Sequence, residues 1–165
     1  MGASAGADGV LFTCSAFAPA IEAAARALPL PVLKPDEAMF KAAMSRGSKI
    51  GMLATFEPAV SSMADAFRRQ AQEAGVDVRL ETICIPEAIV AARAGDIETH
   101  NQLVAAAIPR LASCDAIMLA HFSTSTALDA ARAATQTPIL SAPEAAVLEL
   151  RSAVQARESQ NPGQR

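Results

Sequence analysis

Residues 8–38 read DGVLFTCSAFAPAIEAAARALPLPVLKPDEA, and residues 115–145 read DAIMLAHFSTSTALDAARAATQTPILSAPEA, so one pattern occurs twice at a spacing of 107 positions. Each copy has an aspartate, an apolar run, a polar corner, an alanine-rich segment and a proline followed by a short apolar run. Internal similarity of this kind indicates two related structural units. The alignment places Cys14 over His121, and each occupies the corner that follows the apolar run.

The composition limits the class of protein. The chain has 165 residues, of which 52% are hydrophobic, which suits one ordinary domain or two small lobes and excludes a disordered chain. A net charge of -3 without Trp or Tyr argues against a nucleic-acid surface. No apolar run is long enough to span a bilayer, and no signal sequence opens the chain. We therefore expect a cytoplasmic protein that binds neither nucleic acid nor membrane.

The three cysteines form no zinc-binding pair, and no glycine-rich phosphate loop is present. An odd number of cysteines without a secretion signal predicts free thiols in a reducing compartment. We accordingly expect neither a metal nor a cofactor.

Alternating apolar and helical patterns predict the α/β class with a parallel, doubly wound sheet. Strands are expected over 9–14, 31–33, 49–55, 77–84, 115–121 and 138–141. Helices are expected over 19–28, 35–47, 58–75, 87–94, 98–112 with a kink at Pro109, 125–135 and 143–156.

The second unit has four of these strands and the first has two, so the pattern predicts two pseudo-symmetric lobes, the first truncated at its N-terminal side. Residues 8–47 with 143–157 would form the remnant of the first α/β lobe, and residues 48–142 the complete second lobe. An exposed sheet edge on the incomplete lobe favours a homo-oligomer.

Ligands bind at the carboxyl ends of strands in an open parallel sheet. Hydroxyls and helix starts gather there without Arg or Lys, which favours a small carboxylate held by neutral donors. A thiol at a helix start has a lowered pKa, which makes Cys14 a candidate base or nucleophile, and His121 a candidate acid or base opposite it. The alternatives are that Cys14 is a core cysteine and that His121 hydrogen-bonds the backbone.

Other polar residues have less specific interpretations. Cys84 either lines the same cleft or belongs to the core, and Cys114 is expected to be structural. His100 is expected to be exposed. The remaining candidates are equally compatible with helix capping and with ligand contact, and they are Thr55, Ser123 and Thr124.

The segments LFTCSAF, KIGMLAT and DAIMLAHFS resemble the aspartate/glutamate racemase superfamily, which includes hydantoin racemases, maleate isomerases and arylmalonate decarboxylases. The resemblance, over residues 8–150, implies two pseudo-symmetric lobes, no cofactor, and one cysteine from each lobe on opposite faces of the substrate carbon. It places the first cysteine at Cys14, and it places substrate contacts at Ser15, Ala16, Thr55 and Ser123. The family's second cysteine falls on His121, which is a departure.

The leading hypothesis is a cofactor-independent racemase or isomerase that transfers a proton at the carbon alpha to a carboxylate, through Cys14 and His121. The alternatives are a single-cysteine decarboxylase of the same superfamily and a catalytically silent carboxylate-binding or oligomerisation module. A weaker hypothesis is a Cys14 nucleophile that forms a covalent intermediate.

Overall fold

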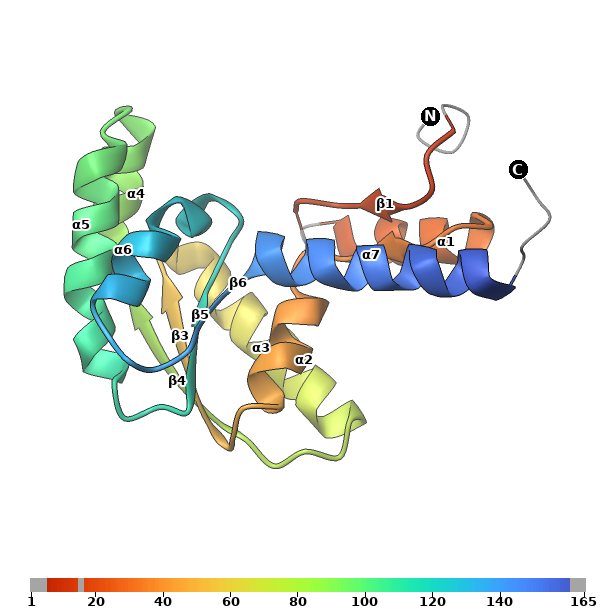
Figure 1. Cartoon of the computed structure of the whole chain (residues 1–165). Coiled ribbons are helices and arrows are strands. Elements are labelled where there is room, and N and C mark those ends of the chain that lie inside the picture. Colours follow the sequence, from red (N-terminus) through yellow and green to blue (C-terminus); the bar gives the residue numbers. More distant parts are fainter. Residues whose placement is uncertain (1–5, 15–16, 161–165) are drawn as a thin grey trace.

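The computed structural model describes residues 6–14 and 17–160 (Figure 1). Within them the strands are β1 (Val10–Leu11), β2 (Val32–Leu33), β3 (Lys49–Ala54), β4 (Arg79–Cys84), β5 (Ala116–Leu119) and β6 (Ile139–Ser141). The α-helices are α1 (Ala18–Ala27), α2 (Glu37–Met44), α3 (Val60–Glu73), α4 (Pro86–Arg93), α5 (Ile97–Ala107), α6 (Leu128–Ala133) and α7 (Ala142–Gln160). Three 3₁₀ segments are η3 (Glu57–Ala59), η4 (Ile108–Leu111) and η5 (Ser123–Ala127). Each expected strand and helix is present within a few residues of its predicted ends.

The larger sheet is parallel, with the strand order β4-β3-β5-β6. Side chains alternate between its two faces along β3 and β5, as the pleat of a strand requires. One face packs on α2 and α3, and the other packs on α5, η4 and α6. Helices on both faces confirm the predicted doubly wound arrangement for this sheet.

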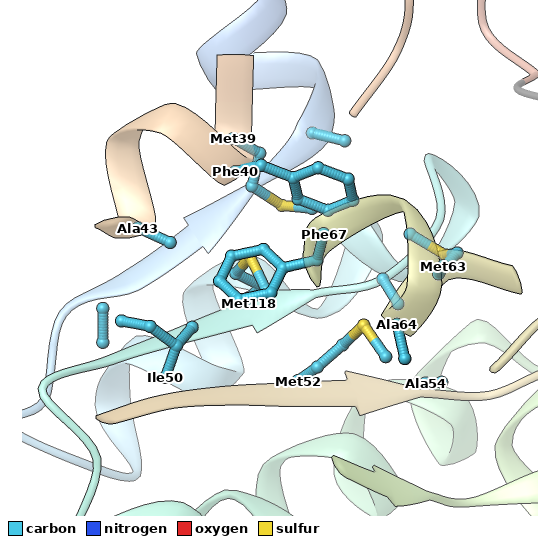
Figure 2. Close-up of a cluster of buried hydrophobic side chains, with 13 residues drawn as sticks. Met39, Phe40, Ala43, Ile50, Met52, Ala54, Met63, Ala64, Phe67 and Met118 are labelled. Atoms are coloured by element: carbon cyan, nitrogen blue, oxygen red, sulfur yellow. The ribbon is translucent and has the colours of Figure 1, made fainter. Parts of the chain in front are cut away.

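The core on the α2–α3 face is built from methionine and alanine side chains, two phenylalanines and Ile50 (Figure 2). The rings of Phe40 and Phe67 meet edge to face, with centroids 5.4 Å apart, and both side chains are at most 2% exposed. An edge-to-face pair of this kind adds about 0.5–1.5 kcal/mol to the burial of the two rings. This contact joins α2 to α3 and fixes both helices on the sheet.

The smaller sheet pairs β1 with β2 in parallel, and its register repeats that of β5 and β6. Val10 pairs with Val32, and the residues 107 positions later, Ile117 and Ile139, pair in the same way. The Val10 amide donates to the Pro31 carbonyl at 2.8 Å, and the Ile117 amide donates to the Pro138 carbonyl at 2.9 Å. The internal similarity of the sequence is therefore confirmed at the level of single hydrogen bonds.

The two equivalent helices α2 and α7 contact each other, and each packs on the sheet of the other unit. α2 follows the smaller sheet in the chain and packs on β5 and β6, whereas α7 follows the larger sheet and packs on β1 and β2 (Figure 1). The predicted division at residues 47 and 143 assigned both helices to the first lobe. That division stays a prediction, and α2 shares a core with the second sheet.

Local sequence signals determine where helix α5, which packs against the candidate site, begins and ends. Asp96 caps α5, because its Oδ1 accepts a hydrogen bond from the Thr99 amide at 3.0 Å. The helix changes to the 3₁₀ segment η4 at Ile108, immediately before the Pro109 at which a kink was predicted. In the described part of the chain no helix is both long enough and apolar enough to cross a membrane.

Candidate active site

The carboxyl ends of β3 and β5 lie side by side and carry the second candidate corner. β3 and β5 are parallel neighbours with Leu53 paired to Leu119, and the Ala120 amide donates to the Leu53 carbonyl at 2.8 Å. Thr55 directly follows β3, and His121 comes two residues after β5. Pairing in the sheet therefore brings these two residues to one edge, as predicted from the strand ends.

His121 is held in a strained backbone conformation. Its φ is 73°, and it is the one non-glycine residue with positive φ in the described part of the chain. For a residue with a Cβ the left-handed region costs roughly 1–2 kcal/mol, and such strain gathers at functional sites. The surrounding structure must therefore hold the His121 corner in place.

The two ring nitrogens of His121 are withdrawn from solvent, although the residue as a whole is partly exposed. Both Nδ1 and Nε2 are buried, and neither has a hydrogen-bond partner among the described residues. Burial lowers the pKa of His121 below its ordinary value of 6.5 and outweighs the Ala120 backbone, which acts in the opposite direction without a well-formed hydrogen bond. The ring is consequently neutral at pH 7 and is able to accept a proton.

Phe56 lies beside the imidazole. Its ring centroid is 6.5 Å from that of His121, with the planes at 69°, and its side chain is 36% exposed. The Arg93 guanidinium carbon, from α4, lies 5.6 Å from the Phe56 ring centroid. A cation over an aromatic face is attracted to it, so Arg93 helps to hold Phe56 against the corner.

The hydroxyls of Thr55 and Thr124 meet beneath this corner. Their Oγ1 atoms are 3.4 Å apart, and the residues are 1% and 0% exposed. Their hydroxyls thus link the end of β3 to η5 from below, whereas Ser123 is exposed. Ser15 and Ala16, the other predicted contacts, lie outside the described residues.

Cys14 occupies the equivalent corner after β1 and is exposed. α1 begins four residues later at Ala18, with Pro19 in its first turn and Phe17, 67% exposed, just before it. Figure 1 shows β1 directed toward the part of the molecule that holds the larger sheet. No hydrogen bond joins Cys14 to His121 in the described part of the chain, so their predicted pairing stays a prediction.

The other two thiols differ from Cys14. Cys84 ends β4 and is half-buried, and burial, together with the nearby Glu57 carboxylate, raises the pKa of its thiol. Cys114 is buried in the core against the α5 face of the sheet, and burial likewise raises the pKa of its thiol. Cys114 is thus a core residue, as expected. Neither thiol is inclined to ionise at neutral pH.

The prediction that His100 is exposed was wrong, because the residue is 2% exposed. Its Nδ1 lies 2.9 Å from Asn101 Oδ1 and 3.4 Å from Thr126 Oγ1, in η5. The sequence did carry a signal: His100 precedes Val104 and Ala107 by four and seven positions, the spacing of one buried helix face. A polar residue at that spacing is easily assigned to solvent.

Comparison with known proteins agrees with this architecture. A search of curated proteins found no match. Among solved structures, glutamate racemase isoform RacE1 from Bacillus anthracis is similar, with 21% sequence identity and a TM-score of 0.59. The alignment covers 91% of this chain and 59% of that one, so this chain spans about three fifths of the length of the glutamate racemase. The two proteins share the fold.

The family comparison covers more than half of the sequence. The model of the Asp/Glu/Hydantoin racemase family matches residues 1–112 of the 165 residues, a range that includes Cys14, Thr55 and the whole of β3 and β4. Together with the two related α/β units and their equivalent corners, this match shows that the chain belongs to the Asp/Glu/hydantoin racemase family.

Proposed function

We propose that this protein is an amino-acid or dicarboxylate racemase or isomerase that needs no cofactor and moves a proton at the carbon alpha to a carboxylate. The observation that carries the proposal is His121, a strained residue at the carboxyl end of β5, where the pattern of the family has a reactive group. Its ring nitrogens are buried, and neither has a hydrogen-bond partner among residues 6–14 and 17–160. Strain and an unpartnered polar group are both costly, so a purely structural role accounts poorly for them.

The chemistry requires two groups on opposite faces of one carbon. In the proposed step the neutral His121 takes the proton as the bond between carbon and hydrogen breaks, and the electron pair moves into the carboxylate. The Cys14 thiol then gives its proton to the other face, which leaves an imidazolium and a thiolate. Exchange with solvent restores both groups. An imidazole with a lowered pKa suits the role of base, because it is unprotonated when substrate binds.

The substrate carboxylate is proposed to bind between the two corners. Ser123 is exposed at the start of η5 and offers a hydroxyl, and the helix starts offer backbone N–H groups. Thr55 and Thr124 support this corner from below through their mutual contact. The contacts at Ser15 and Ala16 are proposed from the family pattern. Assembly into a homo-oligomer is proposed from the exposed edge of the smaller sheet.

One observation favours a second candidate, the single-cysteine decarboxylase. Cys14 is exposed and reachable by a ligand, whereas both nitrogens of His121 are closed off. In that reaction the bond between the alpha carbon and a carboxylate breaks, carbon dioxide leaves, and the bonding electron pair stays on the alpha carbon. The Cys14 thiol then protonates the resulting carbanion. Only one proton-transferring group is then needed.

The two candidates differ in what happens in heavy water. Incubation with a panel of small amino and dicarboxylic acids in D₂O, followed by NMR, would show loss of the alpha-proton signal for a racemase or isomerase. Carbon dioxide release from a malonate with one alpha substituent would instead indicate the decarboxylase. Binding without either reaction would indicate a silent carboxylate-binding module, and it would contradict both enzymatic proposals.

A further inference from the structure

The turn η5 carries the exposed Ser123 and begins two residues after His121. It is a five-residue 3₁₀ segment, a conformation with poorer hydrogen bonds than an α-helix. Around its own backbone turn, the Ser125 amide and hydroxyl donate to the Phe122 carbonyl at 3.2 and 2.5 Å, and the Leu128 amide donates to the Ser125 carbonyl. Because His121 lies just before it at a φ of 73°, the turn needs an external support to keep that conformation.

The Thr55–Thr124 contact with the end of β3 supplies one part of that support, and α5, which packs against η5, supplies another. Thr126 Oγ1 lies 3.1 Å from the Ser123 carbonyl, 3.2 Å from Asn101 Oδ1 and 3.4 Å from His100 Nδ1. The Asn101 amide oxygen only accepts, so His100 Nδ1, 2.9 Å away, carries the hydrogen. Thr126 then shares its one hydrogen between the Ser123 carbonyl and Asn101. The network is therefore continuous from α5 to Ser123.

We propose that His100 is a positioning residue for the corner formed by His121 and Ser123. Through Asn101 and Thr126 it fastens η5 to α5, and α5 is itself fixed by its Asp96 cap and by the core. The consequence for substrate rests on the proposed function, whereas the positioning of His121 does not. The buried, hydrogen-bonded imidazole of His100, which contacts η5, thus determines the position of His121 and Ser123.

The competing interpretation is that His100 simply fills space, since it lies on the buried stripe with Val104 and Ala107. A space-filling residue tolerates an apolar side chain of similar volume, whereas a positioning residue requires its donor. His100→Leu retains volume and removes the donor, and His100→Asn keeps an N–H near the place of Nδ1. Thr126→Val removes the central hydroxyl from an exposed residue, so it acts on the network even where His100→Leu does not fold.

A matched control exists at the other end of the sheet. The Thr137 hydroxyl, just before β6, donates to the Ala112 carbonyl at 3.3 Å and is remote from η5 in the sheet, because β6 runs from this end toward the site. Thr137→Val therefore makes the same chemical change without touching the network.

The first measurement is imidazole NMR of the full chain, which needs no substrate. The protein has two histidines, so the signal left in His100→Asn belongs to His121. We expect the His121 signals to shift or to split into several forms in Thr126→Val and His100→Leu, and to keep their wild-type positions in His100→Asn and Thr137→Val. Unchanged His121 signals in folded Thr126→Val and His100→Leu would overturn the proposal.

The second measurement is alpha-proton exchange with an acid on which the wild-type protein acts. We expect KM to rise about tenfold in Thr126→Val and His100→Leu, with His100→Asn close to wild type. The double variant should be no worse than the worse single variant, because both act through one network. An unchanged KM with only a lower urea midpoint would overturn positioning in favour of space filling. Absence of exchange in the wild-type protein would contradict the proposed function, and the NMR result would still decide the role of His100.

Discussion

The unit β1–α1–β2–α2 and the unit β5–η5–α6–β6–α7 start from the same pattern and end in different environments. Their strands pair in the same register. In each unit the amide at the equivalent position, Val10 or Ile117, donates to the carbonyl of the equivalent proline. At the equivalent corner, however, Cys14 is exposed, whereas the nitrogens of His121 are buried and its backbone is strained. The repeated sequence therefore specifies the pairing of the strands, and it leaves the backbone conformation and the environment of the corner open.

The cause of the difference is the number of neighbours that each strand has. β5 lies between β3 and β6 with helices on both faces, so its corner is enclosed by Phe56 and η5. In the described part of the chain, β1 pairs with β2 alone. Burial of its ring nitrogens lowers the pKa of His121 and favours the neutral imidazole.

The largest expected effect concerns the exposed corner. Cys14→Ser replaces the thiol by a hydroxyl that hardly ionises, and we expect alpha-proton exchange to fall by about two to four powers of ten, the usual contribution of a proton-transferring group. Exchange is measured by NMR in D₂O. Cys84→Ser is the matched control, since burial already raises the pKa of that thiol, and it should retain most of the activity. Undiminished exchange in Cys14→Ser would remove this thiol from the mechanism.

The second effect compares equivalent positions on α2 and α7. Phe40 is 2% exposed and packs on Phe67, whereas Val147, 107 positions later, is 48% exposed. We expect Phe40→Ala to lower the free energy of unfolding by about 3–5 kcal/mol and Val147→Ala by less than about 1 kcal/mol. Urea unfolding measures both. Losses of similar size would show that Val147 is covered in solution.

The third effect tests strain at the buried corner. With a φ of 73° at position 121, His121→Gly should be more stable than His121→Ala by about 1 kcal/mol, because glycine adopts this conformation without cost. Cys14 has no positive φ, so Cys14→Gly should be no more stable than Cys14→Ala. Urea midpoints of the four variants give the comparison. A preference for alanine at position 121 would mean that the strain is relieved in solution.

The smallest effect is a dependence of stability on pH. The pKa of folded His121 is lower than its ordinary value of 6.5, so the unfolded chain binds the proton more readily. The stability due to the neutral ring is fully present above pH 6.5 and is lost as pH falls below it. Between about pH 7.5 and about pH 5.5, wild-type protein should lose more stability than His121→Asn, whose side chain does not titrate. Parallel urea midpoints for the two proteins would contradict burial of the ring.

The order of strands and helices was predictable because its signals are local. Apolar runs gave the buried strands, Pro109 marked the end of α5, and the spacing of 107 positions predicted the second β-pair from the first. The candidate corners followed from strand ends alone. The burial of His100 was missed, because the residue type favoured solvent even though its helical spacing from Val104 indicated the core.

The sequence by itself determined the α/β class, the repeated unit and the identity of the side chain at each corner, because these follow from the order of apolar and polar residues along the chain. The tertiary structure alone decided that α2 and α7 exchange sheets, that Thr55 and Thr124 meet beneath the surface, and that the ring nitrogens of His121 are buried while Cys14 is exposed. Each of these depends on segments that are distant in the sequence and come together only when the chain packs. Solvent exposure, and with it the pKa of a side chain, belongs to the assembled surroundings and not to the residue.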